Sequence, residues 1–301
     1  MAEEDDEFRS LTDPESDPDS IPMFFDRNRH ICYLEMMLEL IPSPYQSQEI
    51  NRLTLAYFAI SGLDILRALD RVDKEGVINW VLSLQAHPRD EAELSNGQFY
   101  GFHGSRSSQF QSNENGDAIP NGSHLASTYC ALSILKILGY DFSLLDSTSI
   151  LKSMKNLQQP DGSFMPIHSG AETDLRFVYC AAAISSMLEN WSGIDKEKAK
   201  EYIINCQSYD GGFGLTPGSE SHETSSNPAC QKGKNETDEH IFECFLLPAA
   251  YQSDHIVLNI LNSYLSYLCC DLLFFFSTWG NFKVVKVNYG CVAINLLSVY
   301  I

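Results

Sequence analysis

Residues 157–164 read LQQPDGSF, and residues 206–213 read CQSYDGGF, 49 positions further along the chain. Each segment follows an amphipathic helical stretch and contains a Gln, an Asp-Gly turn and an aromatic residue. A fixed period of this size is typical of a stacked array of helical hairpins. The sequence therefore predicts an all-α fold, an α/α array of hairpins around an apolar cavity, and such a cavity favours a lipid-like ligand.

The Asp-Gly turn has a physical explanation. An Asp side chain accepts hydrogen bonds from the backbone that follows it, and Gly takes up a positive φ without a steric penalty. We expect the chain to reverse at Asp161 and Asp210, and Phe164 and Phe213 to pack between neighbouring hairpins in a structural role. The segment GQF at 97–99 reads as a looser first copy, displaced by an insertion of charged residues.

Apolar residues recur at helical spacing in seven segments, and breakers such as the Pro-Ser-Pro at 42–44 and Gly139 separate them. The last six segments pair into three hairpins, which end in Gln85, Gln158 and Gln207. The seven segments predicted to be helical are 25–41, 52–69, 74–85, 123–138, 145–158, 173–190 and 195–207.

Charge and composition divide the chain into three parts. Residues 1–20 hold nine acidic residues and one basic residue, Arg9, so they contribute −8 to the net charge of −20, and we expect a disordered acidic tail. Residues 21–222 carry the hairpin pattern and are predicted to form an incomplete toroid. Residues 223–301 are first polar and then apolar without a helical period, so we expect a divergent segment of irregular structure there.

Composition also argues against several classes of protein. A net negative charge disfavours nucleic-acid binding. Nine cysteines without a Cys-x-x-Cys spacing, and the lack of a signal-peptide pattern, predict reduced thiols and a cytoplasmic location. The apolar run 256–276 is long enough to span a bilayer, but it carries Asp271 and two Asn residues, and we expect no membrane span.

Four blocks of sequence carry a resemblance to a known family. They are NRLTLAYFAISGLD at 51–64, SHLASTY at 123–129, DLRFVYCA at 174–181, and YDGGFG at 209–214, which leads to ESH at 220–222. With these blocks, residues 22–222 resemble the β subunits of protein prenyltransferases, and among them those of the type I geranylgeranyltransferases. The third block together with the Asp-Gly-Gly-Phe turn makes the resemblance specific.

The resemblance implies an α/α toroid that forms a heterodimer with a prenyltransferase α subunit. It implies geranylgeranyl diphosphate as the donor, and as acceptors proteins such as small GTPases that end in Cys-aliphatic-aliphatic-X, often with Leu last. It also implies zinc as a cofactor, because the metal ion lowers the pKa of the acceptor thiol. The resulting thiolate attacks C1 of the prenyl group while diphosphate leaves.

By position, the resemblance assigns substrate-binding residues to this chain. Thr54 lies where the family sets the isoprenoid length, since a small residue there leaves depth for a twenty-carbon chain, whereas the farnesyl enzyme carries Trp. His124, Ala126 and Phe177, together with Thr54, match positions around the last residue of the acceptor peptide.

Four further residues belong to the implied substrate-binding set. Arg176 and Tyr179 match residues that contact the prenyl chain and the peptide, and Tyr129 lies in the second block. His222 matches a histidine that hydrogen-bonds the diphosphate. The family follows this histidine with two glycines, whereas Glu and Thr stand at 223–224 in this chain.

Each assignment has a structural alternative. Thr54 lies within a predicted helix and can bond to a carbonyl of that helix. His124 can be a helix-terminal residue only, Arg176 can pair with an acidic neighbour such as Asp174, and Tyr179 can be a core residue.

The metal ligands of the family have no counterpart in this sequence. The family uses an Asp-x-Cys pair and a later His, and this chain contains no Asp-x-Cys. Residues 269–271 read CCD, with the ligand atoms in a different order. His240 and Cys244 are four residues apart with Asp238 nearby, but two residues on a helix face do not complete a zinc site. We therefore predict no catalytic and no metal-binding residue in this chain.

Three hypotheses about function remain. In the first, the chain is a β subunit that transfers a geranylgeranyl group. In the second, it is a truncated, non-catalytic product that at most binds the α subunit. In the third, it is an α/α ring protein similar to the terpene cyclases, which use comparable turns but also an Asp-x-Asp-Asp acid that this sequence lacks. A prenylation assay with the α subunit, zinc and labelled donor separates the first two.

Overall fold

The computed structural model describes residues 26–110, 122–168, 170–210 and 212–221, and within these ranges the regular structure is helical apart from isolated β-bridges. All seven predicted helical segments are confirmed with slightly shorter bounds, and α4 is an addition that periodicity did not predict. The α-helices are α1 (Arg27–Glu39), α2 (Arg52–Ile65), α3 (Lys74–Leu82), α4 (Glu91–Leu94), α5 (Leu125–Ile137), α6 (Ser147–Met154), α7 (Leu175–Met187) and α8 (Lys196–Asn205). Short 3₁₀ helices are η1 (Ser43–Asn51), η2 (Leu69–Arg71), η3 (Ser107–Phe110), η4 (Phe142–Leu144) and η5 (Lys155–Leu157).

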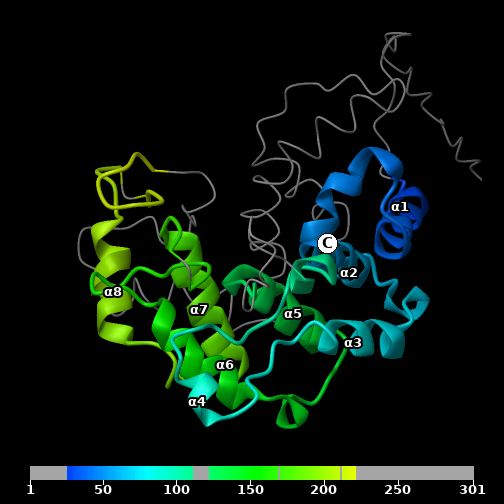
Figure 1. Cartoon of the computed structure of the whole chain (residues 1–301). Helices are drawn as coiled ribbons and strands as arrows, with labels where there is room; N and C mark the ends of the chain where they lie inside the picture. Colours follow the sequence, from blue (N-terminus) through cyan, green and yellow to red (C-terminus); the bar gives the residue numbers. More distant parts are fainter. Residues whose placement is uncertain (1–25, 111–121, 169, 211, 222–301) are drawn as a thin grey trace, which may run out of the picture.

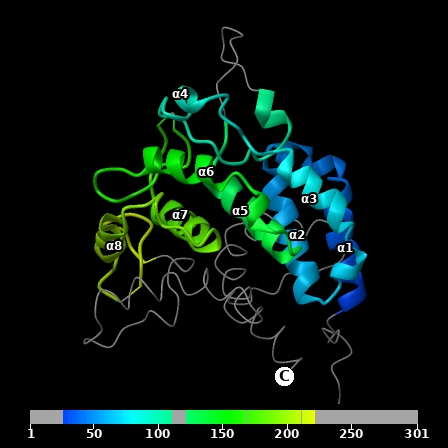
Figure 2. The same ribbon diagram turned by 90° about the horizontal axis from the view of Figure 1, so that it is seen from below.

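Three apolar helices form the inner layer of the fold. Helices α2, α5 and α7 pack side by side in chain order (Figure 1), and most of their residues are buried. Each is followed by a more polar helix, α3, α6 or α8, on the outside of the array (Figure 2). The pairs α2–α3, α5–α6 and α7–α8 are the three predicted hairpins, and they run as an arc from α1 at one side of the molecule to α8 at the other.

The outer helices begin in the same way in all three hairpins. Asp73, Asp146 and Asp195 are their N-cap residues, and each carboxylate accepts a hydrogen bond from the backbone N–H three residues later. An Asp in this position satisfies one of the unpaired N–H groups of the first helical turn. The outer helices therefore start where the sequence supplies an Asp.

The inner helices also end in a common way. Arg67, Gly139 and Glu189 each follow the last turn with a positive φ of 51°, 80° and 51°, respectively. The residue after each donates its N–H to a carbonyl five residues back, at 2.8–2.9 Å. This is the Schellman arrangement, which favours Gly at the left-handed position, so Gly139 fits it without strain and the other two residues do not.

The turn glutamines join successive hairpins. Nε2 of Gln158 donates to the carbonyl of Asp195 at 3.0 Å, and its Oε1 accepts from the N–H of Asp195 at 2.7 Å. Nε2 of Gln85 donates to the carbonyl of Asp146 at 3.2 Å. Because both Asp residues are N-caps, each Gln ties its own turn to the start of the next outer helix, which confirms the predicted structural role.

The first copy of the turn is not where the sequence suggested. Isolated bridges join Gln158 to Phe164 and Gln207 to Phe213, and the corresponding bridge of the first hairpin joins Gln85 to Phe102. The prediction that residues 97–99 form the first copy is therefore wrong. Residues 86–101 separate Gln from Phe in this hairpin, against only residues 159–163 in the second, and this length hides the motif.

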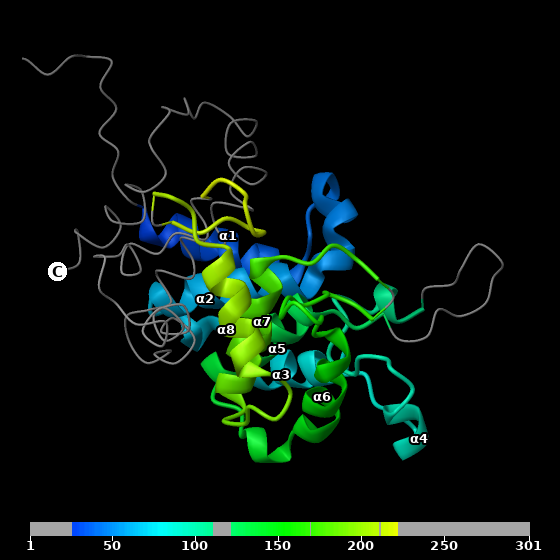
Figure 3. The same cartoon turned by 90° about the vertical axis from the view of Figure 1, so that its left-hand side faces the viewer.

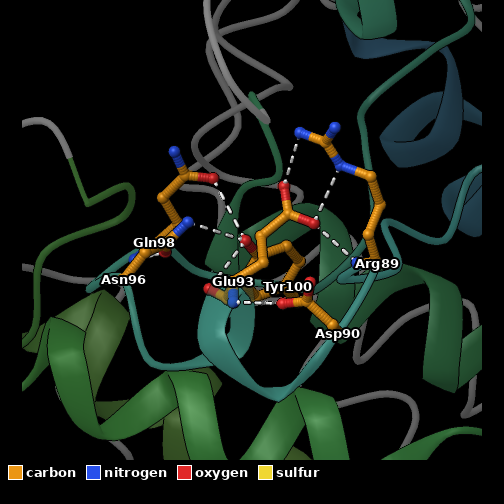
Figure 4. Close-up of polar contacts among 6 residues, drawn as sticks. All are labelled: Arg89, Asp90, Glu93, Asn96, Gln98 and Tyr100. Carbon is orange, nitrogen blue, oxygen red and sulfur yellow. Dashed lines mark hydrogen bonds and ion pairs between the residues drawn. The ribbon is translucent and has the colours of Figure 1, made fainter.

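The long first turn folds as a compact loop around α4 (Figure 4). Nε of Arg89 donates to Oε2 of Glu93 at 3.2 Å, and the hydroxyl of Tyr100 donates to the carbonyl of Glu93 at 3.1 Å. Lys152 on α6 forms an ion pair with Glu91 at 2.8 Å. Figure 3 shows the loop projecting from the array next to α6, so the insertion reaches the outside of the second hairpin, while Phe99 near its end packs in the main core.

The predicted acidic tail and the predicted divergent segment lie outside the described residues, so the three-part division of the chain stays a prediction. Within the described ranges no helix has both the length and the apolar composition that a bilayer crossing requires. The apolar run 256–276 falls beyond these ranges.

Candidate functional site

Seven of the eight predicted substrate-binding residues lie in the described part of the chain, and all seven lie in the first two turns of the inner helices. The eighth, His222, lies outside it. Since α2, α5 and α7 pack side by side and start at the same end of the array, these turns form one surface. Thr54 lies on α2, His124, Ala126 and Tyr129 lie on or at the start of α5, and Arg176, Phe177 and Tyr179 lie on α7.

One type of backbone hydrogen bond recurs in all three hairpins and shows which of their residues are equivalent. The N–H groups of Leu53, Leu125 and Leu175 each donate, at 2.8 Å, to a carbonyl two residues beyond the turn aromatic of their own hairpin. From Leu53 to Leu125 the offset is 72 residues, and from Leu125 to Leu175 it is 50. Residues related by these offsets occupy equivalent places on the inner helices.

Three tyrosines stand at equivalent places and form a row, in which Tyr57 and Tyr129 are buried and Tyr179 is partly exposed. The hydroxyls of Tyr57 and Tyr129 lie 3.1 Å apart, and their rings meet edge to face with centroids separated by 5.6 Å. The rings of Tyr129 and Tyr179 make a similar contact at 5.7 Å. Burial raises the pKa of all three phenols, so they are neutral. Sequence analysis missed Tyr57, although it is related to Tyr129 by the offset of 72.

Thr54 is half-buried at the start of α2 and makes a contact across to α5. Its Oγ1 lies 3.9 Å from Sγ of Cys130, within reach of a weak hydrogen bond from the thiol. Burial raises the pKa of the Cys130 thiol, with the neighbouring Cys180 adding to the effect. Cys130 therefore stays protonated and packs as a small apolar side chain, and it is unsuited to act as a nucleophile or a metal ligand.

His124 is the N-cap of α5, and it also faces α7. Its Nδ1 accepts a hydrogen bond from the N–H of Ala126 at 3.1 Å, and its ring meets Phe177 edge to face at 5.9 Å. Burial lowers the pKa of His124 from its ordinary 6.5 to about 4. The imidazole is therefore neutral near pH 7, and because Nδ1 accepts, the proton is on Nε2.

Arg176 pairs with Asp174, as the structural alternative anticipated, but the pair is not a free surface pair. Asp174 is only 6% exposed and caps α7 by accepting from the N–H of Arg176 at 2.8 Å. Its Oδ2 lies 2.5 Å from Nη2 of Arg176, and the guanidinium lies over the ring of Phe177 at 5.6 Å. A cation fixed in this way is presented to a ligand in one orientation.

The residues of this surface do not fit the zinc ion that the resemblance implies. Across the described ranges, no three side chains of His, Cys, Asp or Glu gather as a metal site would require. Cys130, the thiol beside Thr54, is held protonated by burial. The other candidate donors, at 238–244 and 269–271, lie outside the described residues.

Comparison with known proteins agrees with this architecture. The family model named prenyltransferase alpha-alpha toroid domain matches residues 25–230. The chain is 70% identical over 198 residues to the geranylgeranyl transferase type-1 subunit beta of Arabidopsis thaliana, covering 66% of this chain and 53% of the relative. It is 38% identical over 201 residues to the subunit of the same name from Dictyostelium discoideum, covering 63% and 57%. The chain thus spans about half the length of these curated relatives.

A solved structure, Candida albicans protein geranylgeranyltransferase-I complexed with GGPP, superposes with a TM-score of 0.58 at 21% sequence identity. The match covers 87% of this chain and 69% of the solved chain. At this identity the likeness establishes the fold and carries nothing about individual residues.

Proposed function

Because the chain belongs to the prenyltransferase alpha-alpha toroid family, we propose that residues 26–221 form the substrate-binding part of a cytoplasmic protein geranylgeranyltransferase type I β subunit. Geranylgeranyl diphosphate is the donor, and a protein ending in Cys-aliphatic-aliphatic-X, such as a small GTPase, is the acceptor. A prenyltransferase α subunit is the partner. One observation carries this proposal, namely that seven predicted residues lie at the starts of α2, α5 and α7, which are neighbouring helices.

The side chains of this surface suit a long prenyl diphosphate. Thr54 is small, so it leaves room for the far end of a twenty-carbon chain. Tyr129 and Tyr179 supply an aromatic wall of neutral phenols. Arg176, held by Asp174, supplies a fixed positive charge for a substrate that is anionic at one end.

The neighbouring side chains suit the carboxyl end of an acceptor. His124 is neutral, so its Nε2–H donates a hydrogen bond without bringing a charge that needs a counter-ion. Ala126, whose N–H bonds Nδ1 of His124, and Phe177, whose ring contacts the imidazole, are apolar neighbours of this donor. This combination of one polar donor with apolar neighbours favours an aliphatic last residue such as Leu.

The transfer step needs more than these residues provide. Zinc would supply a lowered thiol pKa at the acceptor, and the described part of the chain holds no set of side chains that fits this ion. This observation supports a second candidate function, in which the chain binds its substrates and the α subunit but transfers no lipid.

Donor binding tests the proposal directly. The full chain is co-expressed with a prenyltransferase α subunit, and the equilibrium binding of labelled geranylgeranyl and farnesyl diphosphates is measured. We expect Thr54→Trp to weaken binding of the twenty-carbon donor by about tenfold or more relative to the fifteen-carbon donor, because a bulky ring removes apolar contact with the chain end. The matched control is Glu197→Trp on the exposed side of α8. Failure of the unsubstituted chain to bind either donor refutes the proposal, and so does an equal effect of the two variants.

A second arm separates the two candidate functions. The same complex is incubated with zinc and a peptide ending in Cys-aliphatic-aliphatic-Leu, and mass spectrometry detects the thioether product. If product forms only when the chain is present, the chain is part of an active enzyme. If the donor binds but no product forms, the result supports the second candidate function, in which the chain transfers no lipid.

A further inference from the structure

We infer that Tyr57 is a positioning residue, which fixes the side chain of Tyr129 and thereby helps to set the length of prenyl chain that the array accepts. This inference rests on the proposed function, because it concerns the same donor site. It adds a residue that lies outside the predicted substrate-binding set and that acts through another side chain.

The inner helices carry two tiers of equivalent residues. The first tier lies at the start of the helices and is partly exposed, whereas the second lies three residues further along each helix, which is a rise of about 4.5 Å. Residues at this spacing share a helix face, so the second tier lies directly behind the first. The first tier is Thr54, Ala126 and Arg176, and the second is Tyr57, Tyr129 and Tyr179.

Behind the tyrosines the core is closed. Ser61, Ser133 and Ala183 follow them by four residues on the three helices, and each is at most 1% exposed. The far end of a prenyl chain that reaches Thr54 in the first tier therefore meets the tyrosine row next. The position of that row limits how deep the chain reaches.

The contacts of Tyr57 explain why it controls this row. Tyr57 is 4% exposed, and its hydroxyl bonds the hydroxyl of Tyr129 at 3.1 Å while the two rings meet edge to face. Tyr129 in turn contacts the ring of Tyr179. Because burial keeps these phenols neutral, the link between Tyr57 and Tyr129 is an ordinary hydrogen bond that needs no charge. Tyr57→Phe removes this bond and leaves the ring contacts in place.

The test compares prenyl diphosphates of different length. The full chain with the α subunit is titrated with labelled fifteen-, twenty- and twenty-five-carbon prenyl diphosphates. We expect Tyr57→Phe to lower the preference for twenty over twenty-five carbons by about fivefold, the factor that one hydrogen bond of average strength is worth. Tyr129→Phe removes the same bond and also the polar contact of the Tyr129 hydroxyl with Tyr179, so it is expected to give a shift at least as large. In the double variant, Tyr57→Phe adds nothing further, because a residue that acts only through the Tyr129 hydroxyl has no effect once that hydroxyl is gone.

The control variant removes a phenolic hydroxyl elsewhere. Tyr100 donates to the carbonyl of Glu93 in the loop around α4 (Figure 4), and we expect Tyr100→Phe to leave the length preference unchanged. An unchanged preference in Tyr57→Phe, with the twenty-carbon donor still bound, overturns this inference and leaves the proposed function standing. Additive effects in the double variant also overturn it, since they assign Tyr57 an effect of its own. If the unsubstituted chain binds none of the three donors, the proposed function falls and this inference falls with it.

Discussion

Lowering the pH from 7 to 5 should destabilise this protein, and His124, which is partly buried at the start of α5, contributes to the loss. His124 is neutral in the folded chain because burial lowers its pKa from 6.5 to about 4. In the unfolded chain the same imidazole titrates near its ordinary value and binds a proton as the pH falls through 6.5. A group with a depressed folded-state pKa contributes stability that is fully present above the unfolded pKa and is lost as the pH falls towards the folded one.

The magnitude follows from these two values. Between pH 7 and pH 5 the unfolded chain gains most of one proton at His124 while the folded chain gains almost none. The linkage relation gives a loss of about 2 kcal/mol in the free energy of unfolding over this interval. Below about pH 4 both forms are protonated and this contribution stops changing.

Urea denaturation at pH 7 and pH 5 measures the effect in the unsubstituted chain and in His124→Asn. Asn is a good N-cap residue and does not titrate, so the variant keeps the bond to the N–H of Ala126 while removing the proton. Other titrating groups act equally in both proteins, and their contributions cancel in the double difference. Equal pH dependence in the two proteins refutes the reasoning, since it means that the imidazole is as basic in the folded chain as in the unfolded one.

Five substitutions test the hairpin architecture by urea denaturation. Glu189→Gly should stabilise the chain by about 1 kcal/mol, because Glu189 has a φ of 51°; a loss of stability contradicts this. Gly162→Ala should cost about 3 kcal/mol or more, because the added Cβ would lie 2.0 Å from a carbonyl oxygen of α8. Gly97 has a φ of 88° but open space around it, so Gly97→Ala should lower the free energy of unfolding by only about 1 kcal/mol. Equal losses in Gly97→Ala and Gly162→Ala would contradict the claim that a steric clash causes the larger loss at Gly162. Gln158→Ala should lower the free energy of unfolding by about 2 kcal/mol, because it removes two hydrogen bonds to the next N-cap. Gln85→Ala removes one such bond and should lower it by about 1 kcal/mol. A larger loss in Gln85→Ala than in Gln158→Ala disproves this role.

The sequence predicts this fold well wherever the responsible forces are local. The apolar pattern located seven helices because the outer helices carry one apolar face and the inner helices are apolar segments whose residues are mostly buried. The Asp-Gly turn was recognisable because Asp161 hydrogen-bonds the N–H of Ser163 at 3.0 Å and Gly162 has a φ of 92°. These interactions lie within a few residues, so the local sequence determines them.

The misplaced first turn shows where local reasoning fails. Phe99 and Phe102 are both fully buried and lie three residues apart, so neither burial nor residue type distinguishes them. The pairing of Gln85 with Phe102 is decided across a loop of sixteen residues. The same insertion obscures the offset that relates Tyr57 to Tyr129, which is why the third tyrosine of the row was missed.

In the candidate site, too, some features could be predicted from the sequence and others could not. The positions of Thr54, His124 and Arg176 followed from a resemblance, and the structure brings them to one end of three neighbouring helices. The pairing of Arg176 with Asp174 is a local contact that the sequence offered as an alternative. The neutral state of His124 depends on its burial against α7, which is distant in the sequence, so no local pattern reveals it.

The link from each turn glutamine to the next N-cap gives the array a polarity. A hairpin anchors its successor and is itself anchored by its predecessor, as neighbouring units are coupled in a one-dimensional lattice. Each bond couples both hairpins that it joins, so order in one hairpin favours order in its neighbour. Removing the link at Gln158 would weaken the coupling between the second and third hairpins by about 2 kcal/mol, while the packing of α5 against α7 still joins them.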